Sequence, residues 1–289
     1  MAEGTFAGKT AVVTGGASGV GKAMCARFAE EGMNVVLADV EAPALEAAAA
    51  ELCELGGNVI GVQADVTSPE SMADLEAASR KAFGNVHVLC NNAGVGIKEA
   101  QRRIWTLTPN DWDWGFGVNV MGVANGLRAF VPNMLAHGEP GHVVNTSSGN
   151  GGLASLPTTP IYASTKAAVT SLTEVLHYQF LMENAALKAH VLFPGPHIVN
   201  TNILSSMRNR PDHLRDDDEP VAYTTMADLA KATGMENMPL TEPEEVADTC
   251  LEGLRSGSFW ILPESRANDA QFQARVDSIL SRSNPALKA

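Results

Sequence analysis

Short apolar runs alternate with alanine-rich stretches along most of this sequence. Candidate helices cover residues 19–31, 42–55, 69–83, 109–136, 161–184 and 243–255. The apolar runs between them cover residues 10–14, 34–39, 58–65, 87–92, 142–147, 188–194 and 258–263. Runs that are apolar throughout suit strands covered on both faces, and strand–helix alternation is typical of a parallel sheet between two helix layers. The sequence therefore predicts an α/β fold with a doubly wound sheet.

The domain organisation follows from what interrupts this alternation. No linker rich in proline, glycine and serine divides the 289 residues, so we expect a single domain over 1–289. Residues 196–242 contain no convincing strand and are rich in Pro, Asn, Asp and Met. We expect this segment to be a substrate-binding insertion over the carboxyl edge of the sheet. Residues 264–289 form a C-terminal tail.

Charge and hydropathy exclude several classes of partner. The net charge of −13 and the pI near 4.9 oppose binding to nucleic acid or to an anionic membrane, because such a surface repels phosphate. The apolar runs are much shorter than the ~20 residues that span a bilayer, and no secretory signal is visible. The four cysteines and seven histidines lack metal-ligand spacing. We expect a cytoplasmic protein with no metal site and no nucleic-acid or membrane partner.

A glycine-rich turn, TGGASGVG at residues 14–21, follows the first apolar run. Glycine permits a tight turn and a close approach of the backbone to a pyrophosphate, whose charge then lies at the positive N-terminus of the next helix. Steric needs alone can also place glycines in a strand-to-helix turn. The cofactor contacts expected here are Gly15, Ser18, Gly19, Val20 and Gly21.

Asp39 ends the second apolar run, 18 residues beyond Gly21. A carboxylate there can accept both hydroxyls of an adenosine ribose and would repel a 2′-phosphate, and no Arg or Lys stands at 15–18 or 40–42. NAD is therefore favoured over NADP. Asp39 could also cap the next helix, and both interpretations could hold. Asp65, at the end of the third run, could likewise cap a helix or reach the adenine amino group.

Tyr162 and Lys166 lie four residues apart at the start of a predicted helix. Side chains at this spacing share one helix face. A phenol with a pKa of about 10 is a poor base near neutrality, and a nearby cation favours its ionised form. This pair predicts that Tyr162 is an acid/base, although the pattern alone could be the start of an amphipathic helix.

These motifs, with NNAG at 91–94 and NTSS at 145–148, strongly resemble the short-chain dehydrogenases/reductases over about residues 8–263. The resemblance implies a Rossmann-like fold with a seven-stranded parallel sheet. It implies a nicotinamide cofactor without metal and hydride transfer between an alcohol and a carbonyl. It also implies a homo-oligomer, a tetramer or dimer, built through helices 109–136 and 161–184.

The resemblance implies further catalytic roles. Ser148 would hold the substrate oxygen, and Asn119 would help hold a water that links Lys166 to solvent. The family serine usually lies thirteen residues before the tyrosine, which here is Gly149. Alignment through VVNTSS selects Ser148 and implies one extra loop residue, with Ser147 as the alternative.

Further cofactor contacts are expected at the ends of the third, fourth and sixth apolar runs. The segment PGPHIVNT has about two residues more than the family's usual PGxVxT spacing, which leaves the match of Thr201 open. Together with Tyr162 and Lys166, the expected contacts are Asp65, Val66, Asn92, Ala93, Gly94, Pro194, Gly195 and Thr201.

The function predicted is an NAD-dependent oxidoreductase that acts on a secondary alcohol or its ketone. The alternatives are a non-catalytic NAD-sensing or protein-binding module, and an NAD-dependent epimerase or dehydratase. Residues 114–134 weakly resemble the branch with benzylic alcohol dehydrogenases for lignin-derived aryl ethers, which does not separate aryl alcohols from steroids or terpenoids. A bulky, apolar substrate is suggested by the apolar side chains of Ile198, Leu204, Met207, Tyr223, Met226, Leu229, Met235 and Met238. Trp105, Trp112 and Trp114 could line the substrate site, pack in the core or contact another subunit.

Overall fold

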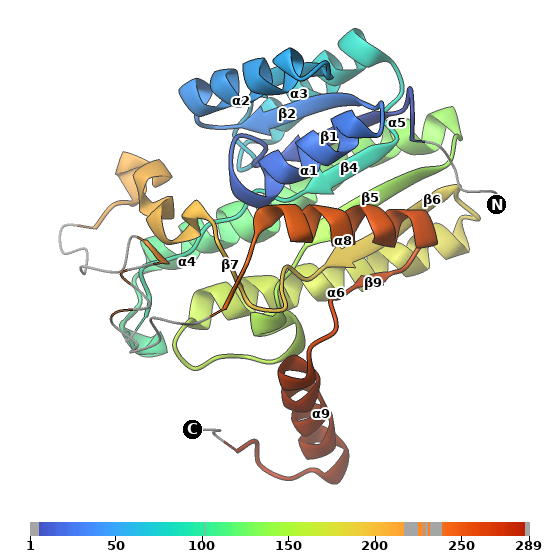
Figure 1. Cartoon of the computed structure of the whole chain (residues 1–289). Helices are drawn as coiled ribbons and strands as arrows, with labels where there is room; N and C mark the ends of the chain where they lie inside the picture. Colours follow the sequence, from blue (N-terminus) through green and yellow to red (C-terminus); the bar gives the residue numbers. More distant parts are fainter. Residues whose placement is uncertain are drawn as a thin grey trace.

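The computed structural model describes residues 6–100, 102–216, 225–226, 228, 231 and 239–286. Its centre is a seven-stranded sheet in the order β3-β2-β1-β4-β5-β6-β9, with every neighbouring pair parallel. The predicted α/β fold is confirmed (Figure 1). The strands are β1 (Thr10–Thr14), β2 (Asn34–Asp39), β3 (Asn58–Gln63), β4 (Val88–Asn91), β5 (Gly141–Thr146), β6 (Leu187–Leu192) and β9 (Trp260–Ile261).

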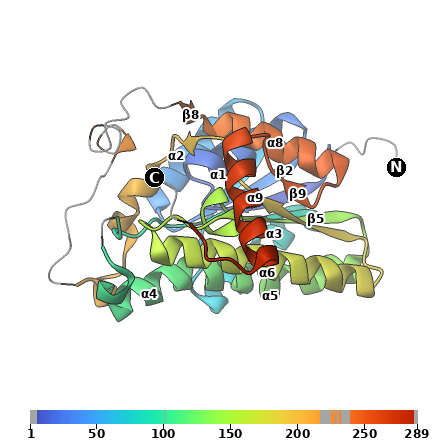
Figure 2. The ribbon, with the colours of Figure 1, turned by 90° about the horizontal axis from the view of Figure 1, so that it is seen from below.

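Helices cover both faces of this sheet, so each face has its own core (Figure 2). One core is formed with α1 (Gly19–Glu30), α2 (Ala42–Glu54) and α8 (Pro243–Ser256). The other is formed with α3 (Pro69–Phe83), α5 (Gly122–His137) and α6 (Pro160–Met182). Burial on both faces explains why the strand sequences are apolar throughout. The strand order reverses between β1 and β4, and ligands of such sheets bind at this point, outside the carboxyl ends of the strands.

The predicted single helix over 109–136 is interrupted. Helix α4 (Pro109–Phe116) leads into a π-helical turn, η2 (Gly117–Met121), before α5 begins at Gly122. The buried side chain of Asn119 in this turn bonds to the backbone of Val95 on both its N–H and its C=O. Apolar periodicity cannot reveal one inserted residue of this kind, which often marks a functional site.

The segment 196–242 contains two strands where the sequence predicted none. They are β7 (Ile198–Val199) and β8 (Leu240–Thr241), which pair in parallel but are too short to produce a sequence pattern. Two 3₁₀ helices, η4 (Asn202–Asn209) and η5 (Asp212–Leu214), follow β7.

The C-terminal tail contains helix α9 (Arg266–Ser281), which the sequence analysis did not predict. Arg275 of this helix donates a hydrogen bond to the carbonyl of Leu153 at 2.7 Å. Within the described ranges, every helix is too short or too polar to cross a membrane.

Candidate active site

The glycine turn between β1 and α1 leaves a helix N-terminus open to an anion. Gly15 and Gly19 have φ of +67° and +51°, and a Cβ on Gly21 would lie 2.0 Å from the carbonyl oxygen of Gly15. The N-cap residue Ser18 makes no side-chain capping bond, and the first turn of α1 has no acidic residue. The side chain of Val20 is buried in the core, so its backbone and not its side chain can contact a ligand. These groups fit the pyrophosphate of a dinucleotide cofactor.

Asp39 holds the glycine turn from the end of β2. One carboxylate oxygen accepts the N–H of Ala17 and the other that of Glu41, each at 3.1 Å. The N-cap of α2 is Glu41, so the interpretation of Asp39 as a helix cap is wrong. Each carboxylate oxygen retains a lone pair, which can accept a ribose hydroxyl.

Asp65 does not cap a helix either, because Ser68 performs this role for α3. The hydroxyl of Ser68 accepts the N–H of Ser71 at 3.1 Å. Asp65 instead accepts both the N–H and the hydroxyl of Thr67, and it remains exposed. The side chain of Val66 packs against Gly122, whose added Cβ would lie 2.8 Å from it.

The loop after β4 is tied to the end of β1. The N–H groups of Asn92 and Ala93 donate to the Thr14 hydroxyl at 3.0 and 3.1 Å. A Cβ on Gly94 would lie 3.4 Å from Asn119 Oδ1 and 3.5 Å from Lys166 Nζ. Glycine therefore lets this backbone approach two predicted catalytic side chains. The other predicted turn, Pro194–Gly195, follows β6.

Helix η4 lies against three of these turns. A Cβ on Gly19 would lie 3.1 Å from Thr201 Cγ2, and the hydroxyl of Ser206 accepts the N–H of Gly96 at 3.2 Å. Arg208 pairs with Glu41, directly after β2. Thr201 thus lies at the glycine turn, and the Arg208–Glu41 contact could not be predicted because 167 residues separate the partners.

Tyr162, Ser148 and Lys166 meet at the carboxyl end of β5. The Ser148 side chain lies close enough to the phenol of Tyr162 to act on its pKa, which it lowers. Lys166 is buried; its Nζ donates to the carbonyl of Thr146 at 2.8 Å and lies 5.6 Å from the centroid of the Tyr162 ring. The arrangement places a phenol, a hydroxyl and an ammonium group together.

The two candidate serines face different surroundings. The buried hydroxyl of Ser147 donates to the carbonyl of Lys166 at 2.9 Å and also bonds to the Thr170 hydroxyl at 2.7 Å. Ser148 instead contacts Tyr162 and accepts the N–H of Asn150 at 3.2 Å. Ser148 is therefore the serine beside the phenol, as alignment through VVNTSS predicts.

Burial is the largest influence on the pKa values of Tyr162 and Lys166. Burial raises the pKa of Tyr162, the hydrogen bond with Ser148 lowers it, and the charge of Glu99 raises it. Burial also lowers the pKa of Lys166 to about 8. Desolvation is the largest of the effects on Tyr162, so the pKa of its phenol is raised.

Asn119 connects the site to the π-helical turn. Its Oδ1 accepts the N–H of Val95 at 2.8 Å, and its Nδ2 donates to the Val95 carbonyl and the Thr165 hydroxyl, each at 3.1 Å. The side chain is buried. Asn119 therefore fixes the loop after β4 next to α6.

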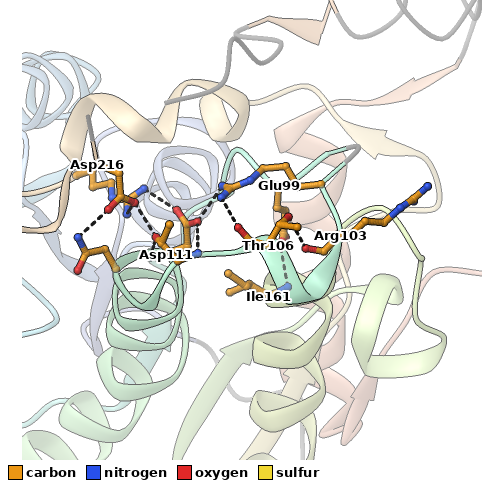
Figure 3. A network of polar contacts seen from close by, with 10 residues as sticks. Glu99, Arg103, Thr106, Asp111, Ile161 and Asp216 are labelled. Carbon is orange, nitrogen blue, oxygen red and sulfur yellow. Dashed lines mark hydrogen bonds and ion pairs between the residues drawn. The ribbon is translucent and has the colours of Figure 1, made fainter. Parts of the chain in front are cut away.

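A polar network that the sequence does not predict lies beside this site (Figure 3). The buried carboxylate of Glu99 accepts the backbone N–H groups of Ile161 and Tyr162, and Asp111 pairs with both Arg102 and Arg210. No motif marks these residues. Their only signal is the presence of charge near apolar segments.

The tryptophan and histidine side chains differ in their surroundings. Trp114 is buried with Ile97 and Ile161, which supports the core interpretation, whereas Trp105 is 79% exposed. His142 bonds to the buried His190 at 2.9 Å.

Among the described residues, no group of three or more His, Cys, Asp or Glu could hold a metal ion.

Several known proteins are similar to this chain in sequence and fold. The family model described as short chain dehydrogenase matches residues 9–212. A solved short-chain dehydrogenase/reductase from Burkholderia phymatum, in complex with NAD, is 38% identical with a TM-score of 0.90 and 99% coverage of both chains. The Cα-dehydrogenase of Sphingobium sp. is 33% identical over 95% of this chain and 87% of its own. The 3β-hydroxysteroid dehydrogenase 2 of Eggerthella lenta is 33% identical over 70% and 75%.

Proposed function

Because the chain belongs to the short-chain dehydrogenase family, we propose that Tyr162 is the acid/base in a hydride transfer between NAD and a secondary alcohol or its ketone. The protein is an oxidoreductase of alcohols or ketones. The observation that carries the proposal is the contact of Ser148 with the phenol of Tyr162, beside the buried ammonium of Lys166.

The roles follow from the positions of these groups. In alcohol oxidation the phenolate of Tyr162 accepts the hydroxyl proton, and Ser148 donates a hydrogen bond to the oxygen on which negative charge develops. Bound NAD supplies the hydride acceptor. Lys166 holds a positive charge near the phenol, and Asn119 fixes the backbone beside it. In ketone reduction the same phenol returns the proton.

The cofactor proposed is NAD. The uncapped N-terminus of α1 is suited to the pyrophosphate, and the carboxylate of Asp39 is suited to ribose hydroxyls but not to a 2′-phosphate. The solved relative in complex with NAD supports this choice.

The substrate proposed is bulky and largely apolar. Segment 196–242 is the proposed substrate-binding insertion, and relatives named Cα-dehydrogenase and 3β-hydroxysteroid dehydrogenase support a large secondary alcohol. Met207 packs in the apolar cluster with Ile161, next to Tyr162. The predicted pocket residues Tyr223, Leu229, Met235 and Met238 lie outside the described residues.

The test is the reduction of NAD by a panel of benzylic alcohols, hydroxysteroids and short aliphatic alcohols. We expect turnover with bulky secondary alcohols and little with short ones. Binding of NAD without turnover of any alcohol, or of any ketone with NADH, would favour the non-catalytic module instead.

A further inference from the structure

Glu99 lies in the loop after β4 and caps α6 from more than 60 residues away along the chain. Its Oε2 accepts the N–H of Ile161 at 2.6 Å (Figure 3). Its Oε1 accepts the N–H of Tyr162 at 2.9 Å. The first turn of a helix leaves such N–H groups without intrahelical partners. The local N-cap residue, Thr159, makes no side-chain capping bond, so Glu99 takes its place.

A buried carboxylate is an unusual cap for a helix of this protein. Three other helices are capped by an adjacent residue: α3 by Ser68, α4 by Thr108 and α8 by Glu242. Glu99 is 0% exposed, and burial of a charge is unfavourable unless it is compensated. A hydroxyl or amide could accept an N–H without that cost. What distinguishes α6 is the phenol of Tyr162 in its first turn.

The charges around Glu99 come from three elements. Arg102 lies in the same loop, Asp111 on α4 and Tyr162 on α6. Arg102 bonds to Asp111 at 2.8 Å, so its charge is already paired. Burial raises the pKa of Glu99 to about 7, and Asp111 adds to this, whereas the two N–H groups and Arg102 oppose it. Ionised Glu99 in turn raises the pKa of Tyr162.

We propose that Glu99 is a positioning residue of the active site, which fixes the first turn of α6 and places a negative charge that acts on the phenol of Tyr162. This inference rests on the acid/base role proposed for Tyr162. Ionised Glu99 keeps the phenol protonated, which suits ketone reduction. Neutral Glu99 lets the phenol ionise at lower pH, which suits alcohol oxidation.

The experiment compares Glu99→Gln with wild type in two pH titrations. The first follows the ultraviolet absorbance of tyrosinate, with the matching Tyr162→Phe protein subtracted, and needs no substrate. The second follows kcat for alcohol oxidation. Removal of the charge should move both midpoints to lower pH by about half to one unit, which is about three- to tenfold more tyrosinate on the rising limb.

Two further variants separate the effect of the Glu99 charge from its structural effect as a helix cap. Glu76→Gln is the matched control, because Glu76 is a buried carboxylate on α3 that bonds to Asn133; both midpoints should remain at the wild-type pH. Glu99→Asp keeps the charge on a shorter side chain, so kcat should fall while the tyrosinate midpoint stays near wild type. This variant also serves if Glu99→Gln does not fold, since a midpoint moved to lower pH in Glu99→Asp contradicts the proposal.

The proposal is overturned if the tyrosinate midpoint of folded Glu99→Gln equals that of wild type, because Glu99 is then only a helix cap. Failure of the proposed function has a different signature. Either wild type would then turn over no alcohol or ketone, or Tyr162→Phe would retain full turnover. In both cases the substrate-free titration would still report whether Glu99 acts on Tyr162.

Discussion

The ammonium of Lys166 donates a hydrogen bond of 2.8 Å to the carbonyl of Thr146, the last residue of β5. The hydroxyl of Thr146 donates in turn to Asn92 Oδ1 at 3.3 Å. One chain of contacts therefore connects α6, the carboxyl end of β5 and the loop after β4. The orientation of Lys166 beside Tyr162 is fixed by the sheet as well as by the helical spacing of four residues.

The first prediction concerns Tyr162. Tyr162→Phe removes the hydroxyl that would exchange the proton but keeps the ring, so kcat should fall by about 10²- to 10⁴-fold. The Kd for NAD should change little, because the glycine turn and Asp39 are untouched. Steady-state kinetics and a fluorescence titration with NAD measure the two quantities. Near-wild-type turnover would end the assignment of Tyr162 as the acid/base.

The second prediction concerns the two serines. Ser148→Ala should lower kcat far more than Ser147→Ala, because Ser148 contacts the phenol. Ser147→Ala should lower the free energy of unfolding by about 1–3 kcal/mol instead, because its buried hydroxyl joins Lys166 and Thr170. Kinetics and urea unfolding of both variants provide the comparison. The reverse order of kcat values would place the catalytic serine at Ser147.

The sequence predicted the fold and most of the candidate site because both depend on local patterns. Alternating apolar runs specify the sheet, and Tyr162, Lys166 and the glycine turn are visible as short motifs. Glu99 could not be predicted, since its carboxylate acts on N–H groups 62 and 63 residues away. The same holds for Arg208 and Glu41, which only the path of residues 196–209 brings together. Contacts that depend on tertiary structure leave no period or spacing in the sequence.

The third prediction uses the pKa of Lys166, which burial lowers to about 8. In the unfolded chain the pKa is about 10.4, so the unfolded state binds more protons between the two values. The folded protein thus carries a penalty for the buried cation below about pH 8, and this penalty disappears as the pH rises to about 10.4. The penalty is on the order of 3 kcal/mol.

Urea unfolding of wild type and Lys166→Met at about pH 7 and about pH 10 tests this linkage. The stability of wild type relative to the variant should rise between the two pH values. Groups that do not interact with Lys166 titrate equally in both proteins and cancel in the difference. A constant or falling difference would show that Lys166 has an ordinary pKa in the folded protein.

The fourth prediction concerns assembly, which we propose to be a homodimer or homotetramer. The end of α6 exposes Leu181 and Met182 at 62% and 80%, and Leu135 of α5 is also exposed. Such apolar surface is more than a solvent-facing helix usually shows. Light scattering should give a multiple of 30.4 kDa. Leu181→Glu should reduce the mass, whereas Leu55→Glu, at another exposed leucine directly after α2, should not. A monomer in wild type contradicts the prediction.

The last prediction concerns the choice of cofactor. In the proposed complex, Asp39 accepts the ribose hydroxyls of NAD and repels the 2′-phosphate of NADP, so wild type should strongly prefer NAD. Asp39→Ala should narrow the ratio of the two kcat/KM values by on the order of 10²-fold. Asp39 also holds the N–H of Ala17, so part of the loss with NAD will come from a looser turn. Asp39→Asn is the control, because it keeps an acceptor for that N–H without the charge.

Reversal of the cofactor preference from NAD to NADP also needs a cation near the 2′-phosphate. The exposure of Ala17 and of Val40 indicates which of the two positions can take an arginine. Ala17 is 8% exposed and lies against the core, whereas Val40 is 44% exposed directly after Asp39. Arginine at Val40 can therefore reach a 2′-phosphate without a clash in the core, and Val40→Arg with Asp39→Ala should favour NADP. Asp39→Ala combined with Ala17→Arg should instead destabilise the folded protein. If wild type already prefers NADP, or Asp39→Ala leaves the ratio of kcat/KM values unchanged, Asp39 serves only to hold the glycine turn.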